Sequence, residues 1–276
     1  MKKLLFGITS LTIGGAERVL VDLANELCEK YEITIFTIYP NGEFEKSLSP
    51  KIKLKSLYKK QYKELNKIQK VLVPLRVWLQ QKSIYKKCVK NDYDVEIAFL
   101  EGAITRIFST RNCETTKISW IHNDISKVFG NNIKSKIKRK IDEKIYSKYD
   151  KLIFVSNDNI KKFEEVYKNN KIEKEVIYNY INSDNVINKA EEIIDIKFDD
   201  NIIYFVTVAR LVEQKAIDRL INIHTRLIKE DYKHKFYIIG DGPEKENYER
   251  IVYDPTNPEH ADVKTEAEYY GDGGAI

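Results

Sequence analysis

Two cations near position 210 have the chemistry that is needed to hold a diphosphate. Arg210 offers a planar fork of hydrogen-bond donors, and Lys215 offers a mobile point charge. The apolar run at 202–209 predicts a strand and the periodicity of 217–229 predicts a helix, so both cations lie between a strand end and a helix start. Together they could bind a diphosphate and neutralise it as it leaves. Ordinary surface charge is the alternative.

Gly14 and Gly15 form a second candidate site for an anion. They lie between a predicted strand at 3–9 and a predicted helix at 16–30. Without Cβ atoms the backbone amides can approach a ligand, and the start of a helix attracts negative charge. A phosphate or a sugar hydroxyl would suit this place, although an ordinary turn also explains the pair. The spacing differs from that of the dinucleotide-binding glycines.

His122 is the third candidate, because it ends the strand that is predicted at 117–122. Ligands bind at the carboxyl ends of parallel strands, so its imidazole would face a ligand. A purely structural role is the alternative.

Metal chemistry is not expected from this sequence. Three further histidines lack the spacing of metal ligands: His224, His234 and His260. Three cysteines lack the paired spacing of a zinc or redox site and are expected to pack in the interior: Cys28, Cys88 and Cys113. The sequence therefore predicts neither a metal nor a bound cofactor.

Strands and helices alternate along the chain, which is typical of an α/β fold with a parallel sheet. In the first part we expect strands at 3–9, 33–39, 95–100, 117–122, 151–155 and 175–178, with helices that include 16–30 and 132–148. A polar connector is expected at 183–200. The alternation then restarts with strands at 202–209 and 235–240, a helix at 217–229, and another helix from Pro243. These patterns predict a first domain at 1–182 and part of a second at 200–250.

Six segments in this order and spacing resemble glycosyltransferase family 4. They are GGAER at 14–18, WIHND at 120–124, VS at 155–156, VIYN at 176–179, ARL at 209–211 with QK at 214–215, and IIGDGPE at 238–244. The resemblance covers residues 3 to 250. It implies a GT-B fold, in which a first Rossmann-like domain takes the acceptor and a second one takes a nucleotide-sugar donor. It also implies a retaining, metal-independent transferase of the hexosyltransferase type.

The resemblance assigns a role to each candidate residue. Arg210 and Lys215 would bind the donor diphosphate, and His122 would lie beside the transferred sugar. Two glycines would line the cleft near phosphate or acceptor: Gly14 and Gly15. Three residues would shape a turn near the nucleoside: Gly240, Asp241 and Gly242.

Two departures from the family pattern affect the expected activity. Ala216 stands where the family usually has glycine after the lysine, a departure that is expected to be tolerated. The larger departure is that the later pair of glutamates separated by seven residues is not found. From about position 251 the periodicity is lost, and 251–276 contains six acidic residues against Lys264. We therefore expect an atypical acidic tail, an incomplete second domain and low activity. A truncated, non-catalytic remnant is the alternative function.

Charge is concentrated in two basic segments. Residues 51–90 contain thirteen Lys or Arg against Glu64 alone, and 127–151 contains nine against three acids. These segments are either solvated faces or sites for a polyanion such as a membrane surface. Apolar residues interleave with the cations at 68–79, where Pro74 would kink or split a helix. We therefore expect 51–90 to attach the first domain to an anionic membrane.

The expected partners follow from these observations. They are a nucleotide-sugar donor, a glycan or lipid-linked acceptor of polysaccharide or glycolipid synthesis, and an anionic membrane surface. A protein that only binds polyanions is the third function considered, but no nucleic-acid module is recognised and no nucleic-acid partner is expected. No apolar run reaches the roughly 20 residues of a membrane span, and the N-terminus is unlike a secretory leader. A cytoplasmic location is expected, and attachment through 51–90 would make the protein peripheral at the inner face of the cell membrane.

Overall fold

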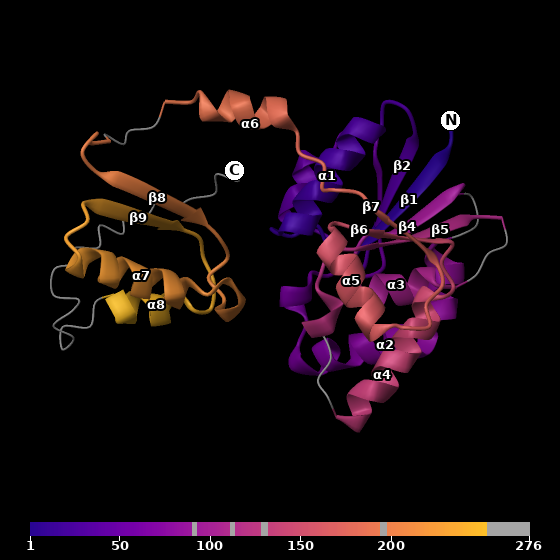
Figure 1. Ribbon diagram of the computed structural model, residues 1–276. Coiled ribbons are helices and arrows are strands. Elements are labelled where there is room, and N and C mark those ends of the chain that lie inside the picture. Colours follow the sequence, from indigo (N-terminus) through magenta and orange to yellow (C-terminus); the bar gives the residue numbers. More distant parts are fainter. Residues whose placement is uncertain (90–92, 111–113, 128–131, 194–197, 253–276) are drawn as a thin grey trace. The chain divides into compact units, whose positions relative to one another are not determined.

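The computed structural model describes residues 1–89, 93–110, 114–127, 132–193 and 198–252 (Figure 1). Expectations for Cys113, His260 and the acidic tail beyond 252 lie outside these residues. The chain divides into two compact units, Met1–Glu191 and Glu192–Ile276, and each is described by itself.

The N-terminal unit is built on a parallel sheet of seven strands in the order β3-β2-β1-β4-β5-β6-β7. The strands are β1 (Lys3–Ile8), β2 (Glu32–Thr37), β3 (Lys53–Ser56), β4 (Val95–Ala98), β5 (Thr116–Ile121), β6 (Lys151–Phe154) and β7 (Glu173–Val176). Six of them were predicted. The order reverses between β1 and β4, which makes their carboxyl ends a place where ligands bind in open α/β sheets.

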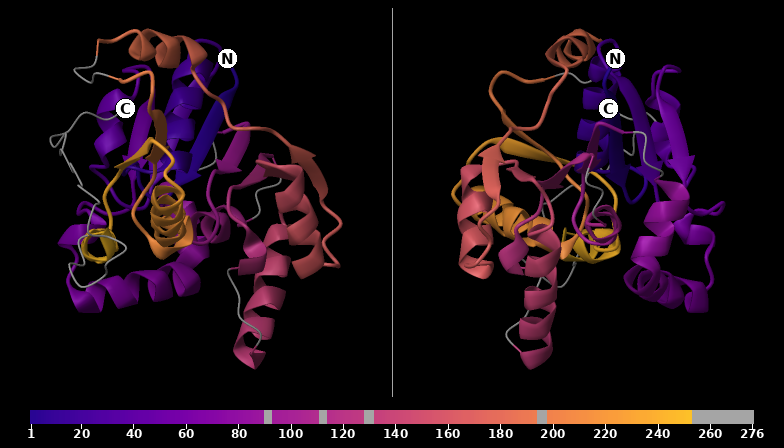
Figure 2. Two further views of the ribbon diagram at one scale, coloured as in Figure 1. Left: turned by 60° about the vertical axis from the view of Figure 1, so that its left-hand side comes forward. Right: turned by 90° about the vertical axis from the view of Figure 1, so that its right-hand side faces the viewer.

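Helices cover both faces of this sheet. The covering helices are α1 (Gly15–Leu27), α2 (Lys67–Cys88), α3 (Ala103–Phe108), α4 (Ile133–Tyr146) and α5 (Asn157–Val166). A sixth helix, α6 (Ser183–Ala190), follows β7 and has no buried side chain. Side chains of α1 join one buried cluster, whereas those of α2, α3, α4 and α5 join the other. Both views of Figure 2 show α2 and α4 at the lower side of this unit.

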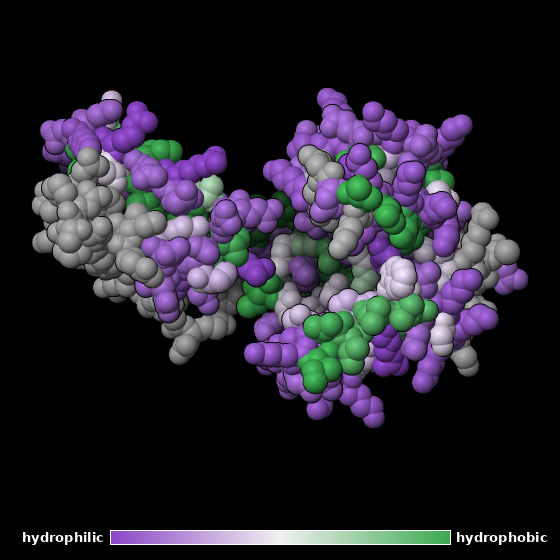
Figure 3. All heavy atoms as spheres, turned by 90° about the horizontal axis from the view of Figure 1, so that it is seen from below, coloured by the Kyte–Doolittle hydropathy of each residue, from purple (hydrophilic) through white to green (hydrophobic). Residues whose placement is uncertain are grey.

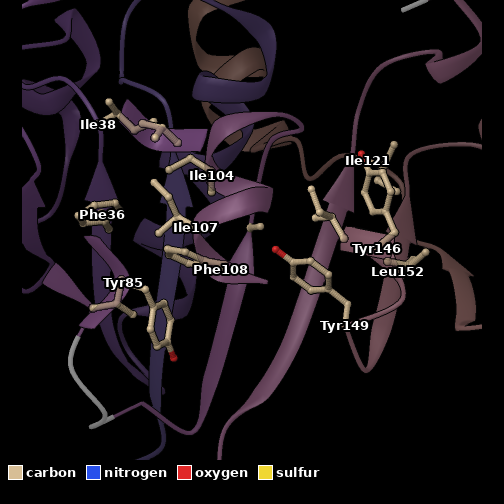
Figure 4. Packing of buried hydrophobic residues seen from close by; sticks show 14 of the residues in the cluster. Phe36, Ile38, Tyr85, Ile104, Ile107, Phe108, Ile121, Tyr146, Tyr149 and Leu152 are labelled. Carbon is tan, nitrogen blue, oxygen red and sulfur yellow. The ribbon is translucent and has the colours of Figure 1, made fainter. Parts of the chain in front are cut away.

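The alternation of strand side chains explains why there are two clusters. On β1, Phe6 and Ile8 point to the face covered by α1, while Leu5 points to the opposite face. Figure 4 shows the second face, where Ile104 and Phe108 of α3 pack over the sheet. A Cβ atom on Gly7 would come within 2.5 Å of the Phe108 ring, so glycine lets α3 lie close to β1.

A charged pair is enclosed in the second cluster. Lys117 Nζ lies 2.5 Å from Glu96 Oε2, and both side chains are almost completely buried. Lys117 also donates to the Phe108 carbonyl and the Tyr85 hydroxyl, while the Tyr85 hydroxyl donates to Glu96 Oε1. Burial lowers the pKa of Lys117, although Glu96 acts in the opposite direction. The pair is therefore tolerated because its hydrogen-bonding groups are satisfied.

Two helices show details that the sequence patterns did not indicate. The polar connector predicted at 183–200 contains α6, whose N-terminus is capped by the Asn182 side chain accepting from the Asn185 N–H. Its side chains are not buried, so no apolar face marked it in the sequence. Helix α2 runs through Pro74, and its non-helical backbone lies instead at Gln80.

The C-terminal unit has two parallel strands, β8 (Ile203–Val208) and β9 (His234–Ile239). Two helices accompany them, α7 (Ile217–Lys229) and α8 (Lys245–Val252), the latter beginning just after Pro243. A small core joins the helices to the loop after β8: Leu211, Ile217, Ile221 and Tyr248. Several apolar strand residues in this unit remain exposed, including Ile203, Val206 and Val208.

Candidate functional sites

In the C-terminal unit, the loops after β8 and β9 are held together by backbone hydrogen bonds. The Ala209 N–H donates to the Ile239 carbonyl at 3.0 Å, and the Leu211 N–H donates to the Asp241 carbonyl at 2.8 Å. The strand pairing is thus extended into both loops. This brings the sequence-predicted residues Arg210 and Gly240 to Gly242 to the same end of the sheet.

Glycine is required in the second of these loops because the first approaches so closely. A Cβ atom on Gly240 would lie 1.8 Å from the Ala209 carbonyl oxygen, and one on Gly242 would lie 2.2 Å from that of Leu211. Asp241 accepts the Gly242 N–H through Oδ1 at 2.8 Å. The tight turn is therefore explained by contacts within the chain, and its role near a nucleoside stays a prediction.

Arg210 and Lys215 present two exposed cations beside this loop pair. Lys215 ends a short 3-10 helix (Glu213–Lys215), and α7 begins two residues later. Within the described parts of the chain, neither cation has a carboxylate within ion-pair distance. Two unpaired cations at a strand end, next to a helix N-terminus, form a suitable place for a phosphate.

Ala216 connects the short helix to α7 in a strained backbone conformation. Its φ of 52° and ψ of 41° lie in the left-handed region. A side chain in this region costs about 1 kcal/mol or more relative to glycine. The structure thus gives a conformational reason for glycine at this position.

In the N-terminal unit, the ends of β4 and β5 are joined by a carboxylate. Glu101, which follows β4, accepts the backbone N–H groups of His122 and Asn123 through Oε1, each at 2.6 Å. Its Oε2 accepts from the Asn123 side chain at 2.9 Å. Asn159 of α5 donates to the His122 carbonyl at 3.3 Å. Sequence reasoning missed Glu101, although an acid directly after a predicted strand was a visible signal.

His122 is held in an aromatic environment. Its ring centroid lies 4.7 Å from that of Phe99 and 6.2 Å from that of Trp120. Its Nε2 is buried and has no hydrogen-bond partner among the described residues. Burial lowers the pKa of His122 from 6.5 to about 4. The imidazole is therefore neutral at pH 7, and it can form a hydrogen bond but cannot supply a positive charge.

The start of α1 already has an acidic side chain close to it. Gly14 has extended backbone and precedes α1, and a Cβ atom there would lie 2.2 Å from Glu17 Oε2. Burial raises the pKa of Glu17. At Gly15 an added Cβ would meet no atom within 4 Å. A ligand therefore has open space beside Gly15, while at Gly14 it would compete with Glu17.

The remaining candidates do not form a metal site. His224 and His234 lie 2.8 Å apart through Nδ1 and Nε2, a proximity that their spacing did not reveal. The described part of the chain contains no group of three His, Cys, Asp or Glu side chains suited to a metal ion. Cys28 is buried and Cys88 is half-buried, and both are free thiols. None of the described helices is both long and apolar enough to span a membrane.

Comparisons with known proteins agree with the architecture. No family model matches the chain. A mutant of S. aureus TarM, solved with fondaparinux, α-GlcNAc-glycerol and UDP, superposes with a TM-score of 0.63 at 13% identity. The match covers 92% of this chain and 75% of the TarM chain. The chain has a GT-B-like fold.

Two curated relatives from Campylobacter jejuni are named as N-acetylgalactosaminyltransferases. One is named as a 4-α-N-acetylgalactosaminyltransferase for N-acetylgalactosamine-N,N'-diacetylbacillosaminyl-diphospho-undecaprenol. It is 28% identical over 264 residues, which are 91% of this chain and 66% of that protein. An α-1,4-N-acetyl-D-galactosaminyltransferase is 44% identical over 57 residues, or 21% of this chain and 16% of its own length. The chain thus spans less than two thirds of the length of each of these relatives.

Proposed function

We propose that this chain is a glycosyltransferase that moves a sugar from a nucleotide-diphosphate sugar to a glycan or lipid-linked acceptor. The observation that carries the proposal is the unpaired cation pair of Arg210 and Lys215, at the carboxyl end of β8 and before α7. The GT-B-like fold and the glycosyltransferase relatives support it.

Arg210 and Lys215 would serve the leaving group. The Arg210 fork can hold two phosphate oxygens, and the Lys215 ammonium can offset the charge that develops as the sugar–phosphate bond breaks. The turn from Gly240 to Gly242 would take the nucleoside, since it lies at the same strand ends.

His122 would act in the N-terminal unit beside the sugar. Because its imidazole is neutral, its proposed contribution is a hydrogen bond to a sugar hydroxyl and not electrostatic stabilisation. Gly15 would line the acceptor side, where an added Cβ meets open space. Retention of the anomeric configuration and independence from metal rest on the family resemblance alone.

The acceptor and location are further parts of the proposal. Both Campylobacter relatives are named for acceptors linked to undecaprenol through diphosphate. We propose a comparable lipid-linked glycan here, with a role in cell-surface polysaccharide or glycolipid synthesis. The reaction would then take place in the cytoplasm at the inner face of the cell membrane.

Titration calorimetry with UDP and GDP tests the donor site. A charge-assisted hydrogen bond contributes about 1.5 to 3 kcal/mol, so Arg210→Ala should weaken binding of the preferred diphosphate more than tenfold. Lys233→Ala is the matched control, because Lys233 is an exposed cation at the opposite end of the same strands. Equal affinity in the wild type and Arg210→Ala would remove the assignment. Tight binding without sugar transfer would favour the non-catalytic alternative.

A further inference from the structure

Helix α2 has apolar side chains on two opposite faces. Its inward face includes Val77, Ile84 and Tyr85, all of which are buried. Six other apolar residues recur at helical spacing on the outward side and are 48% to 72% exposed: Ile68, Val71, Leu72, Leu75, Trp78 and Leu79. A helix that packs on a sheet normally has a polar outer face. The second apolar face therefore indicates that α2 contacts something besides its own core.

Beside this face is a hollow of about 340 Å³ between α2 and the segment before it. Its lining includes three cations, Lys59, Lys60 and Arg76, but no carboxylate. Apolar side chains of the same helix, among them Leu72, also line it. Arg76 lies over the Tyr58 ring, with Cζ 5.7 Å from the centroid. In the described residues none of the three cations has an acid within ion-pair distance.

The charge around α2 decides which occupant fits. Residues 51–90 carry thirteen cations and only Glu64 as an acid. Two of these cations, Lys51 and Lys53, are paired with acids outside the segment, and the remaining excess would repel a second copy of this surface. An anionic lipid surface would be attracted, and it offers an apolar layer directly beneath its phosphates. Tryptophan is enriched at such boundaries, as Trp78 would be here, and lysine side chains can extend from an apolar layer to the headgroups.

A second element has the same character on the same side of the unit. The first half of α4 exposes Ile133 and Ile137 among lysines such as Lys136 and Lys140. Figures 1 and 2 place both α2 and α4 at the lower side of the N-terminal unit, and Figure 3 shows hydrophobic side chains exposed on that underside.

We propose that the outer face of α2 docks on an anionic membrane. The apolar residues insert at the boundary between headgroups and acyl chains, and Lys59, Lys60 and Arg76 hold a lipid phosphate in the hollow. None of these residues belongs to the donor or sugar sites. Membrane binding therefore does not depend on sugar transfer, and either proposal can fail without the other.

Co-sedimentation of the full chain with vesicles tests the proposal. Vesicles of phosphatidylcholine alone are compared with vesicles that contain phosphatidylglycerol, at low and high salt. A charge variant carries Lys59→Gln, Lys60→Gln and Arg76→Gln. Each cation near an anionic surface strengthens binding about fivefold, so the charge variant should need roughly a hundredfold more anionic lipid for half-maximal binding. High salt should likewise weaken binding of the wild type to anionic vesicles.

A matched variant controls for net charge. Lys161→Gln, Lys168→Gln and Lys171→Gln remove three exposed cations outside α2 and should leave binding nearly unchanged. An apolar variant with Leu75→Ser and Trp78→Ser removes exposed side chains only, and its far-UV spectrum and urea midpoint should match the wild type. It should bind anionic vesicles at least tenfold more weakly.

Tryptophan fluorescence reports insertion directly. The chain has two tryptophans, and Trp78 is half exposed whereas Trp120 is buried. Anionic vesicles should shift the emission to the blue and protect Trp78 from acrylamide. The proposal is overturned if the wild type binds neutral and anionic vesicles alike, if the charge control weakens binding as much as the charge variant, or if emission stays unchanged on bound vesicles. A lipid-free dimer that the apolar variant abolishes would also overturn it, since a second copy would then occupy this face.

Discussion

The neutral state of the half-buried His122 makes the free energy of unfolding depend on pH in a specific way. Its pKa is about 4 in the folded chain and near 6.5 when the chain unfolds. Above pH 6.5 the group is neutral in both states. As the pH falls below 6.5 the unfolded chain gains a proton and the folded chain does not, so stability is lost until about pH 4.

The size of this effect can be worked from the two pKa values. At about 1.4 kcal/mol per pH unit, the full difference sets an upper bound on the order of 3 kcal/mol. Between pH 7 and pH 5 the wild type should lose about 2 kcal/mol through this group. His122→Gln has a side chain of comparable size that does not titrate. Because every other group titrates alike in both proteins, the difference between their pH dependences isolates His122.

Urea unfolding of both proteins at pH 7 and pH 5 measures that difference. The wild type should lose about 2 kcal/mol more than His122→Gln over this interval. The NMR resonance of the His122 imidazole can be assigned because it is absent from the spectrum of His122→Gln. In the wild type, this resonance should still have the chemical shift of a neutral ring at pH 5. Titration of that resonance near pH 6.5, or equal pH dependence in the two proteins, would refute the reasoning.

Three further predictions follow from the packing. Ala216→Gly should relieve the left-handed backbone and raise the urea-unfolding free energy of its unit by about 1 kcal/mol, whereas no gain would mean that the strain is absent. Lys117→Met should cost about 3 to 5 kcal/mol by leaving Glu96 buried without its partner, and adding Glu96→Leu should recover most of that loss; equally unstable single and double variants would contradict this. Hydrogen exchange should be slower in β1 than in β8 and β9, because the two-stranded sheet leaves apolar side chains exposed; similar protection would count against it.

The buried strands could be predicted because their sequences are nearly continuous apolar runs. Strand β1 and its neighbours are covered on both faces, and this is what such runs indicate. Strand β3 was missed because it lies at the sheet edge with all its side chains exposed, so neither alternation nor an apolar run marks it. From the sequence, its lysines were interpreted only as part of the basic segment 51–90.

Some of the candidate site residues could be predicted from the sequence, and others could not. Arg210, Lys215 and His122 could be chosen because each follows a predicted strand and matches a motif. Glu101 could not be assigned a partner, since its hydrogen bonds join two strand ends that are distant in sequence. The sequence indicated apolar residues among cations at 68–79, but it could not tell which of them face outward, because periodicity alone does not show which of two apolar faces of α2 meets the core.

Amide NMR spectra of the chain, recorded as UDP is added, test the central claim most directly. The account predicts saturable shift changes concentrated at 209–216 and 240–244, where the two loops and the start of α7 meet. Arg210→Ala should remove most of these changes, and Lys233→Ala should leave them in place. Saturable changes confined to other segments such as 14–18, or none at millimolar UDP and GDP, would contradict a nucleotide-diphosphate site at Arg210 and Lys215.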